Sequence, residues 1–281
     1  MAGSSMKAIK LRIKSVESTM QITKAMQLVA TSKLRRAKER MENSKPYATV
    51  SREAIMKAVS QCSEPQVPFV TPREVNNRCY VVIAGERGLA GGYNANVFKA
   101  VASHAEGVPY CVLPLGRKAI DKFQHMGIKL LNDKIGHVEG LRVSSCYQLA
   151  QRLISGYRDG EFDQLFLVYT SFQSMMSQEV RVEQLLPIER AKEQVERNVA
   201  TIYEPSPEEM LEKAVPDFLA GRLYSAACDS FASEVSARRN AMDSATKNAG
   251  EMISDLKLKY NRARQGAITQ EITEIVAGAE Q

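Results

Sequence analysis

The two ends of the chain carry long amphipathic helical patterns, which constrain its fold more than any other feature of the sequence. Residues 4–60 contain no glycine and a single proline, Pro46. Apolar residues recur there at steps of three and four, as on one face of a helix: Ile9, Ile13, Val16 and Met20, then Met26, Ala30, Leu34, Ala37 and Met41. Forty uninterrupted helical residues span about 60 Å. We expect a kink or a restart at Pro46, because proline removes a backbone donor and crowds the preceding turn.

A second helical pattern begins at residues 206–209 (SPEE), which form a typical start signal. Serine caps a helix N-terminus, proline fits its first position, and glutamate is favoured in its first turn. Pro216 and Gly221 are expected to bend or break this helix. No proline follows before Val276, and apolar stripes run through that range: Ala245, Ala249, Met252, Leu256, Tyr260, Ala263 and Ala267, then Ile268, Ile272, Ile275 and Ala279. The predicted helix is on the order of 80 Å long.

Two long helices at opposite ends of a chain pair most simply as an antiparallel coiled coil. Their charges agree with this pairing. Residues 1–60 hold 13 Lys and Arg against 4 Asp and Glu, whereas residues 206–281 hold 9 against 12. The sequence therefore predicts a rod made of both termini, attached to a compact central domain.

The central region alternates between strand and helix patterns. Predicted strands lie at 78–84 (RCYVVIA), 110–114 (YCVLP), 128–131, 164–170 (QLFLVYT) and 180–186, and predicted helices at 94–105, 117–126 and 144–157. Such alternation favours a mostly parallel sheet with helices on its faces. Pro65, Pro68 and Pro72 mark a linker before it. The predicted fold is α/β, with a terminal two-helix coiled coil and a central Rossmann-like domain. Its parts are residues 1–60, 73–200 and 206–281.

Composition excludes several classes of protein. No apolar run approaches the length that crosses a bilayer, so direct membrane insertion is excluded. The five cysteines are scattered and contain no C-x-x-C pair, which argues against a disulfide scaffold and a zinc knuckle. Tryptophan is absent and aromatic residues make up only 6%, so stacking on single-stranded nucleic acid is not expected.

No catalytic motif emerges from the sequence. Residues 85–92 (GERGLAGG) form a glycine-rich turn, but they match neither a dinucleotide fingerprint nor a P-loop. His104, His125 and His137 lack metal-ligand spacing, so no metal and no cofactor are expected. Two other functions stay open at this point. One is a Rossmann-like ligand-binding protein with helical extensions, and the other is a coiled-coil adaptor or basic nucleic-acid binder.

Several motifs resemble those of one family. Residues 9–40 (IKLRIKSVESTMQITKAMQLVATSKLRRAKER) resemble the N-terminal helix of the gamma subunit of F-type ATP synthases. Residues 88–94 (GLAGGYN) are similar to that family's glycine-rich turn, which usually has Cys at the position of Ala90. Residues 166–188 match a later sheet segment, and the C-terminal helix is matched by residues 233–246 and 258–279. On these motifs the sequence is identified as a member of the gamma-subunit family.

The resemblance implies a function without catalysis by this chain. The terminal helices would form the central shaft inside a ring of alpha and beta subunits, with one gamma chain per three alpha–beta pairs. The central domain would sit with the epsilon subunit on the membrane c-ring. Ion flow would turn the c-ring and this chain together, and the shaft would drive ATP synthesis or hydrolysis at the beta subunits. The expected location is peripheral, on the cytoplasmic side of a bacterial cell membrane.

The resemblance also implies roles for single residues. The expected contacts with a beta-subunit catch loop are Arg264, Gln265, Thr269 and Glu271, with Met26 opposite them on the N-terminal helix. The expected shaft apex, turning in an apolar bearing, consists of Ile268, Ile272, Ile275 and Val276. The expected foot, which faces the c-ring and epsilon, consists of Tyr203 and Glu204. The basic excess of residues 1–60 would face acidic loops inside the ring.

Overall fold

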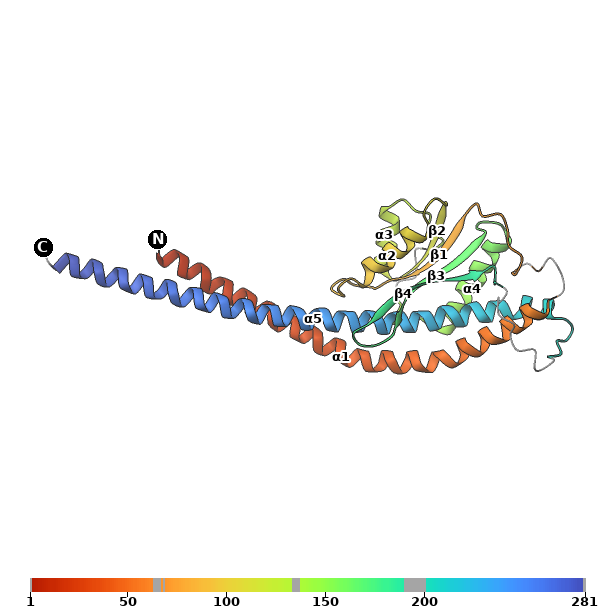
Figure 1. Ribbon diagram of the computed structural model, residues 1–281, viewed down its shortest axis with the longest axis horizontal. Coiled ribbons are helices and arrows are strands. Elements are labelled where there is room, and N and C mark those ends of the chain that lie inside the picture. The colour runs from red at the N-terminus through yellow and green to blue at the C-terminus, as the bar shows by residue number, and fades with distance from the viewer. Residues whose placement is uncertain (1, 63–66, 68, 133–136, 190–200, 280–281) are drawn as a thin grey trace. The chain divides into compact units, whose positions relative to one another are not determined.

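The computed structural model describes residues 2–62, 67, 69–132, 137–189 and 201–279. Its elements, labelled in Figure 1, are α1 (Ala2–Gln61), β1 (Arg78–Ile83), α2 (Tyr93–His104), β2 (Tyr110–Leu115), α3 (Arg117–His125), α4 (Val143–Arg158), β3 (Gln164–Phe172), β4 (Gln178–Leu186) and α5 (Pro207–Ala279). The chain divides into two compact units. Residues 1–31 and 238–281 make up the first unit, and residues 32–237 make up the second, so α1 and α5 contribute to both.

A four-stranded mixed sheet forms the centre of the second unit, with the order β2-β1-β3-β4. β1 pairs in parallel with both β2 and β3, and β4 runs antiparallel to β3. This is the predicted α/β arrangement, in which strand 180–186 lies beside strand 164–170. The predicted strand at 128–131 is instead a single bridge between Val112 and Leu130.

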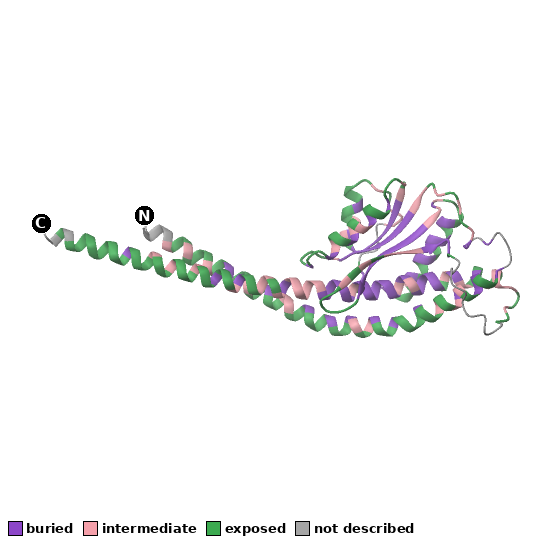
Figure 2. Ribbon diagram, in the orientation of Figure 1, coloured by how far each residue is buried: buried purple, intermediate pink, exposed green. Residues whose placement is uncertain are grey.

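Strands β1, β2 and β3 are buried on both faces after their first residue, whereas most of β4 is exposed or only partly buried, as the colours in Figure 2 show. Successive residues of a strand point to opposite faces. Tyr80 and Val82 of β1 accordingly join an apolar cluster with residues of α2 and α3. Cys79, Val81 and Ile83 join a larger cluster with residues of α4, α1 and α5. The near-continuous apolar sequence of β1 follows from this two-sided burial.

Polar side chains of α5 fasten the end of β3. Asp229 Oδ1 accepts a hydrogen bond from the Phe172 amide at 2.9 Å, and Ser233 Oγ donates to the Thr170 carbonyl at 3.2 Å. Ser236 Oγ donates to the carbonyl of Met175, in the turn between β3 and β4. Buried polar groups need partners, so serine and aspartate on a buried helix face give α5 a fixed position on the sheet.

Neither internal proline ends its helix: of the alternatives expected, the restart at Pro46 and the break at Pro216 do not occur. α1 continues through Pro46, and α5 continues through Pro216. Proline inside a helix costs roughly 3 kcal/mol. Burial after Pro46 offsets that cost, because Ile55, Ala58 and Val59 are almost fully buried in the larger cluster.

Gly221 is a packing position in α5 rather than a break. A Cβ at Gly221 would lie 2.5 Å from Cε1 of Tyr47. The ring of Tyr47 on α1 therefore approaches the backbone of α5 more closely than any side chain at 221 would permit. Of the expected linker prolines, Pro65 and Pro68 lie outside the described residues, and Pro72 lies between α1 and β1 in neither a helix nor a strand.

Candidate functional site

The two terminal helices pair antiparallel in the first unit, where Figure 1 shows them side by side. Gln27 Nε2 donates to Asp243 Oδ1 at 2.8 Å, and the hydroxyls of Thr23 and Thr246 are 2.8 Å apart. Further along, Val16 packs in one apolar cluster with Ala249 and Ile253, with Ile13, Met20 and Leu256 at its margin. Residue numbers fall on α1 as they rise on α5. The predicted antiparallel pairing is confirmed.

The last three turns of α5 expose an apolar surface. After Ala267, which is buried, the large apolar residues are between about half and three quarters exposed: Ile268, Ile272, Ile275 and Val276. Spacings of three and four place them on one side of the helix. Figure 2 shows this end of α5 as almost wholly exposed. Grouped apolar side chains in contact with water are typical of a surface that binds another protein.

The polar residues of this segment are also exposed. Arg264, Gln265, Thr269 and Glu271 all lie on the surface of α5. Thr269 Oγ1 donates to the carbonyl of Gln265 at 2.9 Å, a bond within the helix. Within the described part of the chain, Arg264 and Glu271 form no ion pair. Their charges are therefore available to an external partner.

The sequence predicts that Met26 lies opposite Arg264, but the structure does not place it there. Its neighbour Gln27 bonds Asp243, so Met26 is half-buried near that part of α5. At about 1.5 Å per residue, Arg264 lies roughly 30 Å further along the helix. Sequence motifs identify the two segments, but they do not give the register in which the segments pair. Arg264 and Gln265 are neighbours in the sequence, and the structure leaves Met26 apart from both.

The expected foot residues lie just before α5 in the second unit. Tyr203 is half-buried and packs against the larger apolar cluster. Burial raises the pKa of its hydroxyl. Glu204 is exposed, and Ile202 beside it is 91% exposed. Tyr203 thus anchors this short segment to the apolar cluster, while Ile202 and Glu204 on either side of it are exposed and accessible to a partner.

Sequence reasoning missed several exposed apolar residues. Ile202 is one of them, and four more lie on α1 in the first unit: Leu11, Ile22, Leu28 and Val29. These four lie off the predicted buried stripe, at positions that an isolated helix would fill with polar residues. Large apolar residues outside the buried stripe are therefore the sequence signal from which this exposed surface could have been predicted.

The glycine-rich turn at 85–92 is a packing feature. A Cβ on Gly85 would lie 2.8 Å from Oε1 of Glu234, a residue of α5 that is only 3% exposed. The Gly85 amide donates to Asn94 Oδ1 at 2.8 Å. A carboxylate held against the turn repels phosphate and occupies the space beside it. The geometry therefore disfavours a nucleotide at this turn and, with it, the ligand-binding alternative.

Two further findings bear on function. No group of three or more His, Cys, Asp or Glu residues in the described ranges could hold a metal ion. Across those same ranges, none of the helices combines the length and the apolar character that a membrane span requires.

Comparisons with known proteins agree with the motifs. A family model described as ATP synthase matches residues 5–281. The ATP synthase gamma chain of Ruminococcus albus is 45% identical over 275 residues, which cover 96% of both chains. The sodium-ion-specific ATP synthase gamma chain of Acetobacterium woodii is 39% identical over 292 residues, which cover 97% of both chains.

Solved structures share the fold. The rotor of the Euglena gracilis mitochondrial ATP synthase superposes with a TM-score of 0.68 at 16% identity, covering 95% of this chain and 99% of that one. The central stalk of the Tetrahymena thermophila enzyme gives a TM-score of 0.62 at 23% identity, covering 80% and 99%. Together with the identities above, which extend over nearly the whole chain, these findings give its family. The chain belongs to the ATP synthase gamma chains, the non-catalytic rotor subunits of the central stalk.

Proposed function

We propose that this chain is the central shaft of an F-type ATP synthase, turning inside a ring of three alpha and three beta subunits. The observation that carries the proposal is the antiparallel pairing of α1 and α5, followed by a C-terminal segment with exposed apolar residues. A helix with that surface needs a protein around it. The bearing of a rotary ring supplies an apolar surface on all sides.

The shaft couples two distant events without bond chemistry. Ion flow turns the c-ring, and this chain turns with it. An asymmetric shaft presents a different side to each beta subunit in turn, so each catalytic site passes through discrete conformations. The shaft is the rigid element of this coupling, and its orientation determines which conformation each beta subunit favours. In the reverse direction, ATP hydrolysis turns the shaft and pumps ions.

The proposed contacts fall into three groups. Arg264, Gln265, Thr269 and Glu271 engage a catch loop of beta. Ile268, Ile272, Ile275 and Val276 turn in the apolar bearing, and Met26 contacts beta at its own level, near Asp243. Tyr203 and Glu204 form the foot on the c-ring and the epsilon subunit, and exposed Ile202 adds apolar surface there. Through that foot the chain is peripheral to the membrane, on its cytoplasmic side.

Reconstitution with alpha and beta subunits of a bacterial ATP synthase tests the proposal. We expect one large complex holding a single copy of this chain per three alpha–beta pairs, with ATPase activity that depends on the chain. Removing residues 260–281, or changing Arg264→Ala together with Gln265→Ala, should lower turnover. Lys257→Ala is the matched control, because it removes an exposed charge about two turns earlier on the same helix. A chain that stays monomeric under these conditions would instead favour a coiled-coil adaptor for another partner.

A further inference from the structure

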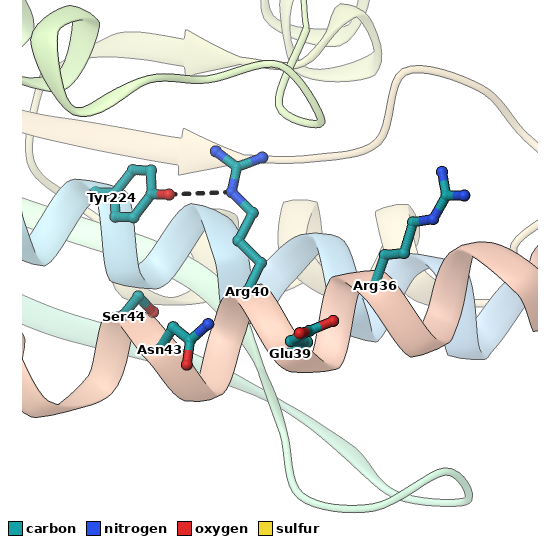
Figure 3. A pocket seen from close by; sticks show the side chains of 6 residues that line it. All are labelled: Arg36, Glu39, Arg40, Asn43, Ser44 and Tyr224. Carbon is teal, nitrogen blue, oxygen red and sulfur yellow. Dashed lines mark hydrogen bonds between the residues drawn. The ribbon is translucent and has the colours of Figure 1, made fainter.

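Arg40 joins three segments of the second unit. From α1, its Nε donates to the Tyr224 hydroxyl on α5 at 3.1 Å, the bond drawn in Figure 3. Its Nη1 donates to the Glu139 carbonyl at 2.6 Å, and its Nη2 donates to the Leu141 carbonyl. The guanidinium carbon is also 5.1 Å from the centre of the Tyr224 ring. One side chain thus holds α1, α5 and the segment 137–141.

That segment is in turn tied to the sheet. Glu86, in the glycine-rich turn after β1, accepts a hydrogen bond from the Val138 amide at 3.0 Å. Lys33 on α1 forms a 2.7 Å ion pair with Glu139. Val138 and Leu141 are both about 5% exposed, so the segment is anchored by burial as well. One polar connection from the sheet to α1 therefore runs from Glu86 through residues 137–141 to Lys33 and Arg40, beside the apolar cluster that β1 and α1 share.

On one side of Arg40, no side-chain packing within the described part of the chain reinforces these hydrogen bonds. We call the contacts of Arg40 with Tyr224, Glu139 and Leu141 the clamp. A cavity of about 330 Å³ lies beside it, lined by Arg36, Glu39, Arg40, Asn43, Ser44 and Tyr224 (Figure 3). The cavity is open to solvent, so no side chain of the described residues packs against Arg40 on that side. A planar guanidinium with five donors in fixed directions can satisfy three acceptors at once, which a lysine ammonium on a flexible stem does less well. Position 40 therefore favours arginine over lysine, because arginine can donate to all three acceptors at once.

We propose that Arg40 is a positioning residue of the rotor: it fixes the segment 137–141, and through it the sheet, to both long helices of the second unit. This inference rests on the proposed function, because coupling under load has meaning only for a rotating shaft. Torque that enters beside Tyr203 reaches α5 along the chain directly. α1 turns with α5 only through lateral contacts, and Arg40 supplies a fixed one. Loosening it should let α1 lag when the rotor works against an ion gradient.

The test uses the complete ATP synthase in membrane vesicles, carrying Arg40→Ala, Arg40→Lys or the control Asn43→Ala. Asn43 is exposed and lines the same cavity, about one turn along the same helix. For Arg40→Ala we expect normal assembly and unchanged ATP hydrolysis when the membrane is made leaky. ATP-driven ion pumping should fall several-fold, and more steeply as the gradient builds. Arg40→Lys should fall between Arg40→Ala and wild type, and Asn43→Ala should match wild type.

Hydrogen exchange in the same complexes reports on the clamp itself. Loss of charge-assisted hydrogen bonds should raise exchange at residues 137–146 by roughly tenfold. Faster exchange with fully retained pumping would overturn the proposal, because the clamp would then be structural only. Unchanged exchange would overturn it as well. If Arg40→Ala fails to assemble, Tyr224→Phe removes one acceptor alone and should show the same effects more weakly; wild-type behaviour in that variant would contradict the proposal. Failure of the wild-type complex to couple would count against the proposed function instead.

Discussion

Gly116 stands where β2 ends and α3 begins, and no other residue type fits there. Its φ is +96°, and a Cβ would lie 2.0 Å from the Ala84 carbonyl oxygen at the end of β1. Gly116→Ala should therefore lower the free energy of unfolding by about 3 kcal/mol or more, since both the backbone and the neighbouring strand must shift. Urea unfolding of the purified chain measures this.

Gly88→Ala is the matched control for that substitution. A Cβ at Gly88 meets nothing within 4 Å, and its φ is not in the positive range. Its effect should stay below about 1 kcal/mol. Equal unfolding midpoints for the two variants would contradict the close approach of residue 116 to β1.

Glu161 should make the stability of the second unit depend on acid pH. A hydrogen bond from Arg152 at 3.0 Å lowers the pKa of this carboxyl, and Lys129 at 3.8 Å adds attraction. Because the folded pKa is lowered, its contribution is complete above the unfolded pKa of about 4.3. The contribution is lost as the pH falls through the folded pKa. Since both partners are partly exposed, Glu161→Gln should cost at most about 1 kcal/mol at neutral pH.

Denaturant titrations across pH check this linkage. The difference between wild type and Glu161→Gln should shrink as the pH falls below the unfolded pKa. Glu106→Gln, at an exposed position between α2 and β2, should change neither the level nor the slope. A difference that grows toward acid pH would mean that the sign of the pKa shift is wrong.

At the scale of elements, the pairing of α1 with α5 depends on a small apolar cluster. Ile253 is 7% exposed and packs in one cluster with Val16 and Ala249. Ile253→Ala should weaken the first unit by about 2–4 kcal/mol. Hydrogen exchange should then rise in residues 7–27 while β1 stays protected. Met252→Ala, at a 45% exposed neighbouring position, should have a small effect; equal effects would contradict the register.

Periodicity predicts most helices and strands correctly because a local pattern of residues marks each of them. The apolar runs of β1 and β3, and the start signal at residues 206–209, can be recognised from neighbouring residues alone. The failures depended on distant ones. Helix α1 passes through Pro46 because residues of other elements bury the turns beyond it. The position of Met26 depends on how two helices align, and a repeating pattern permits several alignments.

The candidate site was predictable only in part for the same reason. Motifs located Arg264 and Tyr203 along the chain, but not their exposure. The clamp at Arg40 was invisible, because backbone carbonyls accept its bonds and leave no mark in the sequence. A carbonyl acceptor is common to every residue type. Such contacts are found only once the fold is known.

At the scale of the whole molecule, the net charge of +6 arises from residues 1–60, which belong almost entirely to α1. Lys33 is paired with Glu139, whereas Arg35 and Arg36 are exposed. Positive charge on a shaft should speed its association with an acidic ring. Arg35→Gln together with Arg36→Gln should slow assembly at low salt and reduce its salt dependence. Stopped-flow light scattering measures the rate; identical rates at every salt concentration would contradict this role.

A single label on the exposed turn between β3 and β4 tests directly whether this chain rotates inside the alpha–beta ring. All five native cysteines are buried, and Met176, in the turn between β3 and β4, is 83% exposed. Met176→Cys therefore offers one reactive thiol for a visible probe, on a complex fixed to a surface through its beta subunits. On addition of ATP, the probe should turn in one direction, with three pauses per revolution, one for each beta subunit. A probe that stays still while the same complexes hydrolyse ATP would contradict the proposal that this chain is the rotating shaft.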